Sequence, residues 1–144
     1  MRRMYLAAVA LLAGCPSEPP PACTTEIIDT SCAPGYVPTF DNVYENTLKI
    51  DCGSGRGSCH SDSGDGEMSL ADPATAYASL LAGHVTPGDP TCSELIVRTH
   101  DLGTDYQMPP GNPLSAVERC ALVKWVAAGA PGPGEPLPMT GTAR

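Results

Sequence analysis

The chain has 144 residues, with 15 Gly, 16 Pro, 7 Cys and a formal net charge of -8. This length fits one small domain with flanking segments, and 42% hydrophobic against 17% charged residues indicates a folded core rather than a wholly disordered chain. The 8 Lys and Arg residues are scattered along the sequence and form no basic face for a phosphate backbone, which excludes nucleic-acid binding.

The first residues predict export. Residues 2–12 begin with two arginines and continue as an apolar run that is too short to cross a bilayer as a permanent helix. The run ends in Leu-Ala-Gly-Cys at Cys15, which resembles the lipobox of bacterial lipoproteins. The resemblance implies a signal peptide at 1–14, lipidation of Cys15 and a lipid-anchored mature protein. By the same analogy, Pro16 favours the outer membrane, facing the periplasm or the cell surface. The alternative is an ordinary cleaved signal.

The two ends of the mature chain are predicted to be disordered. Residues 15–38 are rich in Pro, Ser and Thr without a sustained apolar period, which is typical of a tether. Cys23 and Cys32 lie nine positions apart, so a local disulfide is expected in an oxidising compartment. Residues 131–144 contain too many Pro and Gly for a regular element and predict a free tail. The folded unit is therefore expected over residues 39–130.

The first half of this unit predicts two helices. The first ends near residues 52–53 and has an apolar face of Phe40, Val43, Tyr44 and Leu48. The second begins at Asp72 and Pro73, which supply an N-cap and a proline at the first helical position. It ends at Gly83 and carries Tyr77, Leu80 and Leu81.

The second half predicts two more helices. A short one runs from Thr91 to about Arg98. In the last, Ser115 and Glu118 form a capping box, Gly129 ends the helix, and an apolar stripe consists of Val117, Ala121, Trp125 and Ala128. No run alternates with period two, so strands are not expected. The predicted fold class is a small, loop-rich, all-α domain.

A domain of this size needs covalent links or a cofactor to complete its core, because one Trp and one Phe provide little apolar burial. Cys92 and Cys120 lie in the third and fourth predicted helices. A disulfide between them would close a loop of about thirty residues and contribute about 3 kcal/mol. The sequence therefore predicts a Cys92–Cys120 bond.

The segment from Cys52 to His60 reads CGSGRGSCH and ends in the Cys-His pair that c-type haem attachment requires. In that motif two thiols add to the haem vinyl groups, and the adjacent imidazole becomes an iron ligand. The usual motif has two residues between the cysteines, whereas this one has six. Three of the six are Gly, so a looped-out segment can return both sulfurs to one haem edge. A haem attached through Cys52 and Cys59, with His60 as an iron ligand, is therefore sterically possible.

Further motifs follow in order: VTPGDP at 85–90, MPP at 108–110 and VKWVAAGA at 123–130. Together with the Cys-His motif they resemble a c-type cytochrome-like domain of exported lipoproteins in planctomycetes and myxobacteria, over roughly residues 39–131. The resemblance implies a cytochrome c fold and electron transfer by a covalent haem c. It also implies Cys52 and Cys59 as thioether anchors, His60 as proximal ligand and Met108 as distal ligand. Independently, a thioether is a soft, neutral iron ligand, and two prolines after Met108 stiffen its loop.

Alternatives remain for the ligand and for the function. His84, just before the VTPGDP turn, is the other candidate for the distal ligand. In the alternative function, Cys52 and Cys59 form a disulfide and the domain is a haemless, disulfide-stapled surface or interaction module. A third hypothesis is a sensing or docking appendage that binds a small ligand at an open iron position.

Other site types fit the sequence less well. The acidic residues of 62–67 lack the spacing of a calcium loop, and a zinc site that adds His84 or His100 to the thiols is disfavoured because exported thiols oxidise. Without a Ser-His-Asp order, a zinc-protease helix or a nucleophile elbow, no enzyme is expected. The negative charge favours a basic redox partner protein.

Overall fold

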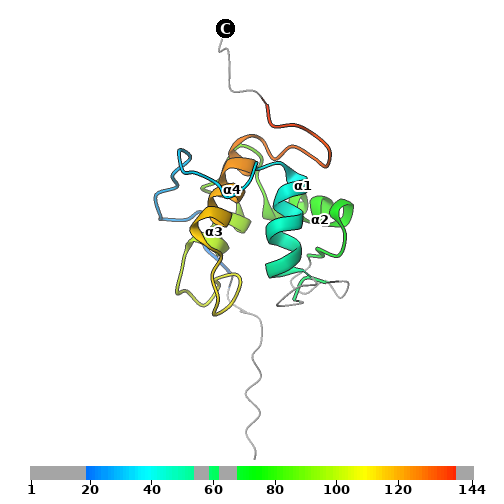
Figure 1. The fold of residues 1–144 in the computed structure, drawn as a ribbon. Coiled ribbons are helices and arrows are strands. Elements are labelled where there is room, and N and C mark those ends of the chain that lie inside the picture. Colours follow the sequence, from blue (N-terminus) through cyan, green and yellow to red (C-terminus); the bar gives the residue numbers. More distant parts are fainter. Residues whose placement is uncertain (1–18, 54–58, 62–67, 139–144) are drawn as a thin grey trace, which may run out of the picture.

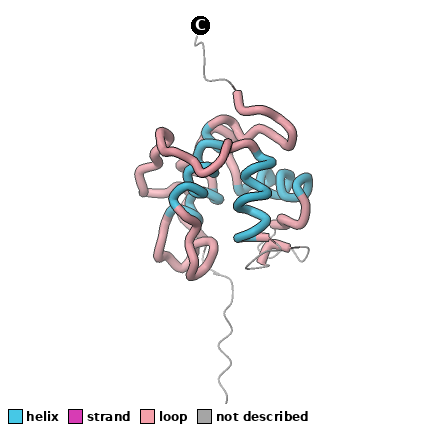
Figure 2. The backbone as a smooth tube through the Cα atoms, in the orientation of Figure 1, coloured by secondary structure: helices cyan, strands magenta, loops and turns pink. Residues whose placement is uncertain are grey.

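The computed structural model describes residues 19–53, 59–61 and 68–138 (Figure 1). Every regular element in these ranges is a helix, and long loops connect them (Figure 2). Their order is α1 (Phe40–Val43), η1 (Tyr44–Cys52), α2 (Pro73–Ser79), η3 (Leu80–His84), α3 (Glu94–His100) and α4 (Ala116–Ala127), where η denotes a π-helix. The predicted all-α class is confirmed. The predicted signal peptide, Cys15 and the segments 54–58 and 62–67 lie outside the described residues.

The first predicted helix is formed by α1 and η1, which continue into each other through residues in right-handed helical conformation. Thr39 caps its start, because the Thr39 hydroxyl accepts a hydrogen bond from the Asn42 amide. The predicted apolar face is buried throughout and consists of Phe40, Val43, Tyr44 and Leu48. The helix ends at Cys52, with Gly53 beyond it, as predicted.

The second predicted helix is formed by α2 and η3. The Asp72 carboxylate caps it by accepting a hydrogen bond from the Thr75 amide at 3.0 Å, and Pro73 occupies the first helical position. Near its end Gly83 has a φ of 143°, a conformation that disfavours any side chain. Leu80 is fully buried, whereas Leu81 is 38% exposed.

α3 begins three residues later than predicted, because the turn before it is fixed by Ser93. The Ser93 hydroxyl donates to the Asp89 carbonyl at 2.7 Å and also bonds with Thr86, and the Asp89 carboxylate accepts from the Cys92 amide. These bonds satisfy the backbone of residues 86–92 as a turn rather than as a helix. Ser93 is therefore the N-cap residue of α3.

α4 has the predicted capping box, in which Ser115 and Glu118 bond reciprocally to each other's backbone amides. Within the predicted stripe, Ala121 and Trp125 are fully buried, but Val117 is 47% exposed. Val117 lies in the first turn of the helix, where the N-terminal segment passes at Gly35: the Gly35 amide donates to the Val117 carbonyl at 3.4 Å.

The core is built around the Phe and the Trp. The Phe40 ring lies 5.5 Å from the Trp125 ring and 5.1 Å from the Tyr77 ring, measured between centroids. These contacts pack α1 against both α4 and α2. The Trp125 indole N–H is satisfied by the Pro131 carbonyl at 3.0 Å, so the largest side chain of the core is buried without an unpaired polar atom.

Both predicted disulfide pairings are wrong, although all four cysteines form disulfides. Cys23 bonds to Cys92, and Cys32 bonds to Cys120. The sequence predicted a local pair, Cys23 with Cys32, and a pair between helices, Cys92 with Cys120. The structure instead has two long-range bonds. The physical reason is that the N-terminal segment folds back along α3 and α4, which places Cys23 beside the turn before α3 and Cys32 beside α4 (Figure 1).

The N-terminal segment is attached to the domain from Cys23 onward, in contrast to the free tether expected over residues 15–38. Thr24 is only 6% exposed; its amide donates to the Thr91 carbonyl at 2.9 Å and its hydroxyl donates to the Asp101 carboxylate. Farther along, the hydroxyl groups of Tyr36 and Thr47 share a hydrogen bond. The folded unit thus begins well before residue 39.

The segment after α4 is also attached at its start, where residues 131–144 were expected to trail free. The Gly134 amide donates to the Asp41 carboxylate at 3.0 Å, and the Ala130 carbonyl accepts from the Tyr77 hydroxyl at 3.0 Å. Residues 139–144 lie outside the described part. Among the described residues, none of the helices combines the length and hydropathy needed to cross a membrane.

The end of α3 makes stability depend on pH through His100. Burial lowers the pKa of His100 below its ordinary value of 6.5, and Arg119 lowers it further, whereas Asp101 acts in the opposite direction. The unfolded chain therefore binds this proton more readily, so the free energy of unfolding falls as the pH drops from about 6.5 toward the lower folded pKa. We expect urea unfolding between about pH 5 and 7.5 to show this slope, and His100→Gln to flatten it. Equal slopes for both proteins would contradict the prediction.

Candidate functional site

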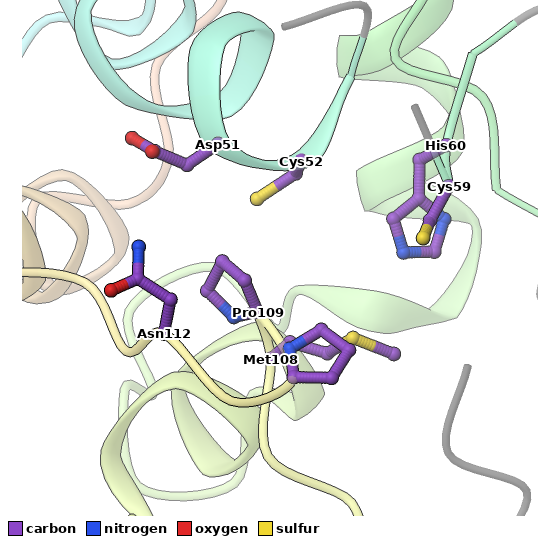
Figure 3. Close-up of a pocket in the computed structure, with 8 residues that line it drawn as sticks. Asp51, Cys52, Cys59, His60, Met108, Pro109 and Asn112 are labelled. Atoms are coloured by element: carbon purple, nitrogen blue, oxygen red, sulfur yellow. The ribbon is translucent and has the colours of Figure 1, made fainter. Parts of the chain in front are cut away.

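The end of η1, residues 59–60 and the loop after α3 meet around one pocket of about 190 Å³ (Figure 3). Its walls are formed by Asp51, Cys52, Cys59, His60, Met108, Pro109, Pro110 and Asn112. All four residues predicted to hold a haem therefore line the same pocket. In the view of Figure 3, Cys52 lies at the end of the helix above the pocket, Met108 lies below it, and Cys59 with His60 lies on the right.

His60 is placed by two backbone hydrogen bonds. Its amide donates to the Cys52 carbonyl at 3.1 Å, and its carbonyl accepts from the Leu70 amide at 2.6 Å. The first bond holds His60 against the end of η1, and the second ties it to Leu70, whose side chain is buried in the core. A side chain at Gly53 would come within 3.1 Å of the Leu70 carbonyl, so glycine permits this close approach. The Cys-His pair is thus held beside Cys52 by the main chain.

Cys52 and Cys59 both carry thiols, because neither belongs to the two disulfides. Burial, with a smaller contribution from the neighbouring Asp51 carboxylate, raises the pKa of the Cys52 thiol to about 12. Cys52 is consequently a neutral thiol near neutral pH and a poor nucleophile toward oxidants.

Met108 is held in the pocket wall by its own main chain. Its amide donates to the Arg98 carbonyl at 2.8 Å, which ties the loop to α3. Pro109 follows through a cis peptide bond, and Pro110 follows that. The thioether therefore comes from an irregular segment that is fixed to a helix.

His84, the alternative distal ligand, is not among the pocket-lining residues. Its Nδ1 lies 2.8 Å from a carboxylate oxygen of Glu94, whose other oxygen accepts from the Arg98 guanidinium at 2.7 Å. Burial raises the pKa of Glu94, but the hydrogen bonds from Arg98 and His84 outweigh that effect, so this pKa lies below its ordinary value. The His84 imidazole is thus engaged at the contact between η3 and α3.

The described residues contain no group of three His, Cys, Asp or Glu side chains close enough to hold a metal ion. The zinc grouping considered from the sequence is therefore not formed among them. The donor set instead suits a c-type haem, which takes two thiols, an imidazole next to the second thiol and a thioether. A pocket of about 190 Å³ is smaller than the roughly 300–1,000 Å³ of usual small-molecule sites, so it would enclose only part of a porphyrin.

Sequence reasoning missed some residues of this region. Asp51 and Asn112 line the pocket at the side of Cys52, and no motif marked either of them. It also missed Gln107, whose only sequence signal is its position before Met108. No protein-family model, curated protein or solved structure matches this chain.

Proposed function

We propose that the protein is a lipid-anchored monohaem c-type cytochrome-like electron carrier. In this proposal Cys52 and Cys59 bind haem c covalently, and His60 and Met108 are its axial ligands. The observation that supports it is the meeting of these four side chains at one pocket, although Met108 comes from a distant loop. Haem c bound there supplies one-electron iron chemistry.

The two cysteines serve as covalent anchors. Each thiol adds across a vinyl C=C bond: a carbon–sulfur bond forms and the hydrogen goes to the neighbouring carbon, so no oxidant is consumed. This chemistry requires reduced sulfur, and both residues are thiols. Since four other cysteines are already joined as two disulfides, the protein can keep its covalent links and still use this pair for attachment.

The two ligands and the wall set the electronic environment. His60 is only 8% exposed, and its backbone bonds restrict where the imidazole can lie. Met108 offers a neutral, soft sulfur, a ligand type that raises the potential of haem iron. Pro109 and Pro110 add apolar surface to the pocket wall beside Met108. An apolar wall that excludes water also raises the reduction potential, because it disfavours the more highly charged oxidised iron.

The location and partner belong to the same proposal. Export and lipidation at Cys15 would place the domain at a bacterial membrane, in this proposal the outer membrane, facing the periplasm or cell surface. A formal net charge of -8 suits a basic redox partner, with association that weakens as salt is added.

The test is expression with a haem-attachment system, followed by haem staining of the denatured protein, intact mass and a reduced-minus-oxidised spectrum. We expect a covalent adduct of one haem and the spectrum of a c-type cytochrome. The matched control is Cys52→Ala with Cys59→Ala, which spares both disulfides and is expected to lose the stain. A blank stain for the unaltered protein would overturn the proposal.

The second candidate is a haemless, disulfide-stapled surface or interaction module. The observation that favours it is the pair of disulfides that fastens the N-terminal segment to α4 and to the turn before α3. The same intact mass separates the two candidates. Without haem, the mass would lie below that of the fully reduced chain. The difference would be the hydrogens lost in two disulfides if Cys52 and Cys59 stay reduced, or in three disulfides if they pair.

A further inference from the structure

We propose that Gln107 is a positioning residue that holds the Met108 thioether at the pocket. This inference rests on the proposed function, because there Met108 is the distal ligand. Gln107 does not line the pocket itself; it acts through the backbone on both sides of its neighbour.

The Gln107 side chain spans the loop. It is buried, at 7% exposure, and both ends of its amide are used. The oxygen accepts from the Gly103 amide at 2.7 Å, and the nitrogen donates to the Pro109 carbonyl at 2.9 Å. Pro109 lines the pocket, so one of these bonds ends on the pocket wall directly after Met108.

Arg98 provides a second attachment for the same loop, on the side of the helix. Its carbonyl accepts from the Met108 amide at 2.8 Å, and its guanidinium donates to the Tyr106 carbonyl at 3.3 Å. The guanidinium is itself held by Glu94 at 2.7 Å. Arg98 therefore ties both neighbours of Gln107 to α3, while Gln107 joins the start of the loop to the residue after Met108.

The two attachments have different consequences for Met108. The Arg98 bonds hold the loop to α3, whereas the Gln107 bonds set the path of the chain on either side of the thioether. An irregular segment without such bonds samples many backbone conformations, and ordering it costs conformational entropy. A ligand held in advance avoids that cost when it binds. A glutamine that is buried and bonded at both ends supplies this order.

The test compares haem-bearing Gln107→Leu with the unaltered protein. Leucine retains much of the volume but removes both hydrogen bonds. We expect unchanged covalent haem content, a loss of most of the spectroscopic signature of methionine-ligated iron, and a reduction potential shifted toward that of Met108→Ala. Tyr106→Phe is the matched control: it removes the 3.0 Å bond to Asp101 in the same loop and is expected to keep the signature. A Gln107→Leu protein with the unaltered signature and potential would overturn the inference.

A second variant distinguishes the loss of a hydrogen bond from misfolding, and a second measurement tests the role of Gln107 independently of the proposed function. Gln107→Glu keeps the shape and the acceptor for Gly103 but removes the donor to Pro109, and it is expected to lose the signature as well. In the full chain as purified, with or without haem, peroxide oxidation of Met108 is expected to be several-fold faster in Gln107→Leu, with Met68 as internal reference. Absence of haem in the unaltered protein would refute the function, whereas equal oxidation rates would refute the role of Gln107.

Discussion

Replacing Cys32 and Cys120 together by Ala is expected to lower the free energy of unfolding by about 4 kcal/mol. The bond between them joins residues 88 positions apart. Because the Cys23–Cys92 bond already links the two segments, the second bond closes a loop of roughly 40 residues, which still removes a large part of the conformational entropy of the unfolded chain. A small domain is stable by about 5–15 kcal/mol in total, so the loss is a large share. Denaturant unfolding followed by circular dichroism measures it, and a loss below about 1 kcal/mol would contradict the prediction.

The same double variant also tests the pairing. In the structure it removes one disulfide and leaves Cys23 bonded to Cys92. Had the cysteines paired locally, as the sequence suggested, the variant would break two bonds and expose two new thiols. Thiol alkylation with intact mass should therefore find no additional reactive cysteine compared with the unaltered protein. Cys23→Ala with Cys92→Ala is the matched control, with a separation of 69 residues and a similar expected loss.

The starts of α2 and α4 could be predicted because each carries its own local signal. Asp72 caps α2 and Ser115 caps α4, and both do so with side chains that bond within three residues of their own position. The disulfides could not be predicted in this way. Cys32 meets Cys120 only because the chain returns along α4, and no feature near either residue reports that path. Val117 shows the same limit: it belongs to the predicted apolar stripe of α4, yet it is 47% exposed. A stripe in the sequence does not reveal which of its members the rest of the chain covers.

The site shows the same division. Cys59 and His60 are adjacent in sequence, so the Cys-His pair can be recognised without knowing the fold. Met108 could be identified by its position in the order of motifs. Gln107 could not be recognised, because a glutamine in a polar loop looks like a solvated residue until its burial and its two amide bonds are known. Asn112 likewise reaches the pocket only through the course of the loop.

The N-terminal attachment changes what lipidation would mean for electron transfer. With the domain fastened at Cys23, only eight peptide links separate it from the lipid proposed on Cys15. Fully extended, they span at most about 26–29 Å. A tether that stayed free until residue 39 would reach roughly three times as far. The proposed carrier would therefore work close to its membrane, and its partner would have to approach it there.

On the proposed function, Met108→Ala is expected to lower the reduction potential by on the order of a hundred millivolts or more, because axial-ligand identity sets haem potentials over about 0.8 V. His84→Gln is expected to leave the potential near that of the unaltered protein. His84 is held by Glu94 at 2.8 Å and does not line the pocket, whereas Met108 does. Spectroelectrochemical titration of both variants measures the difference.

The opposite pattern, a shift with His84→Gln and none with Met108→Ala, would assign the distal position to the histidine and require η3 to move away from α3. No shift with either variant would mean that neither side chain binds the iron, as expected of a domain that receives a small ligand at an open position. The outcomes therefore distinguish methionine, histidine and an open sixth position. A shift with Met108→Ala alone is the expected outcome, because Met108 lines the pocket already. Moving His84 there would break its bond to Glu94 and leave that carboxylate with Arg98 alone.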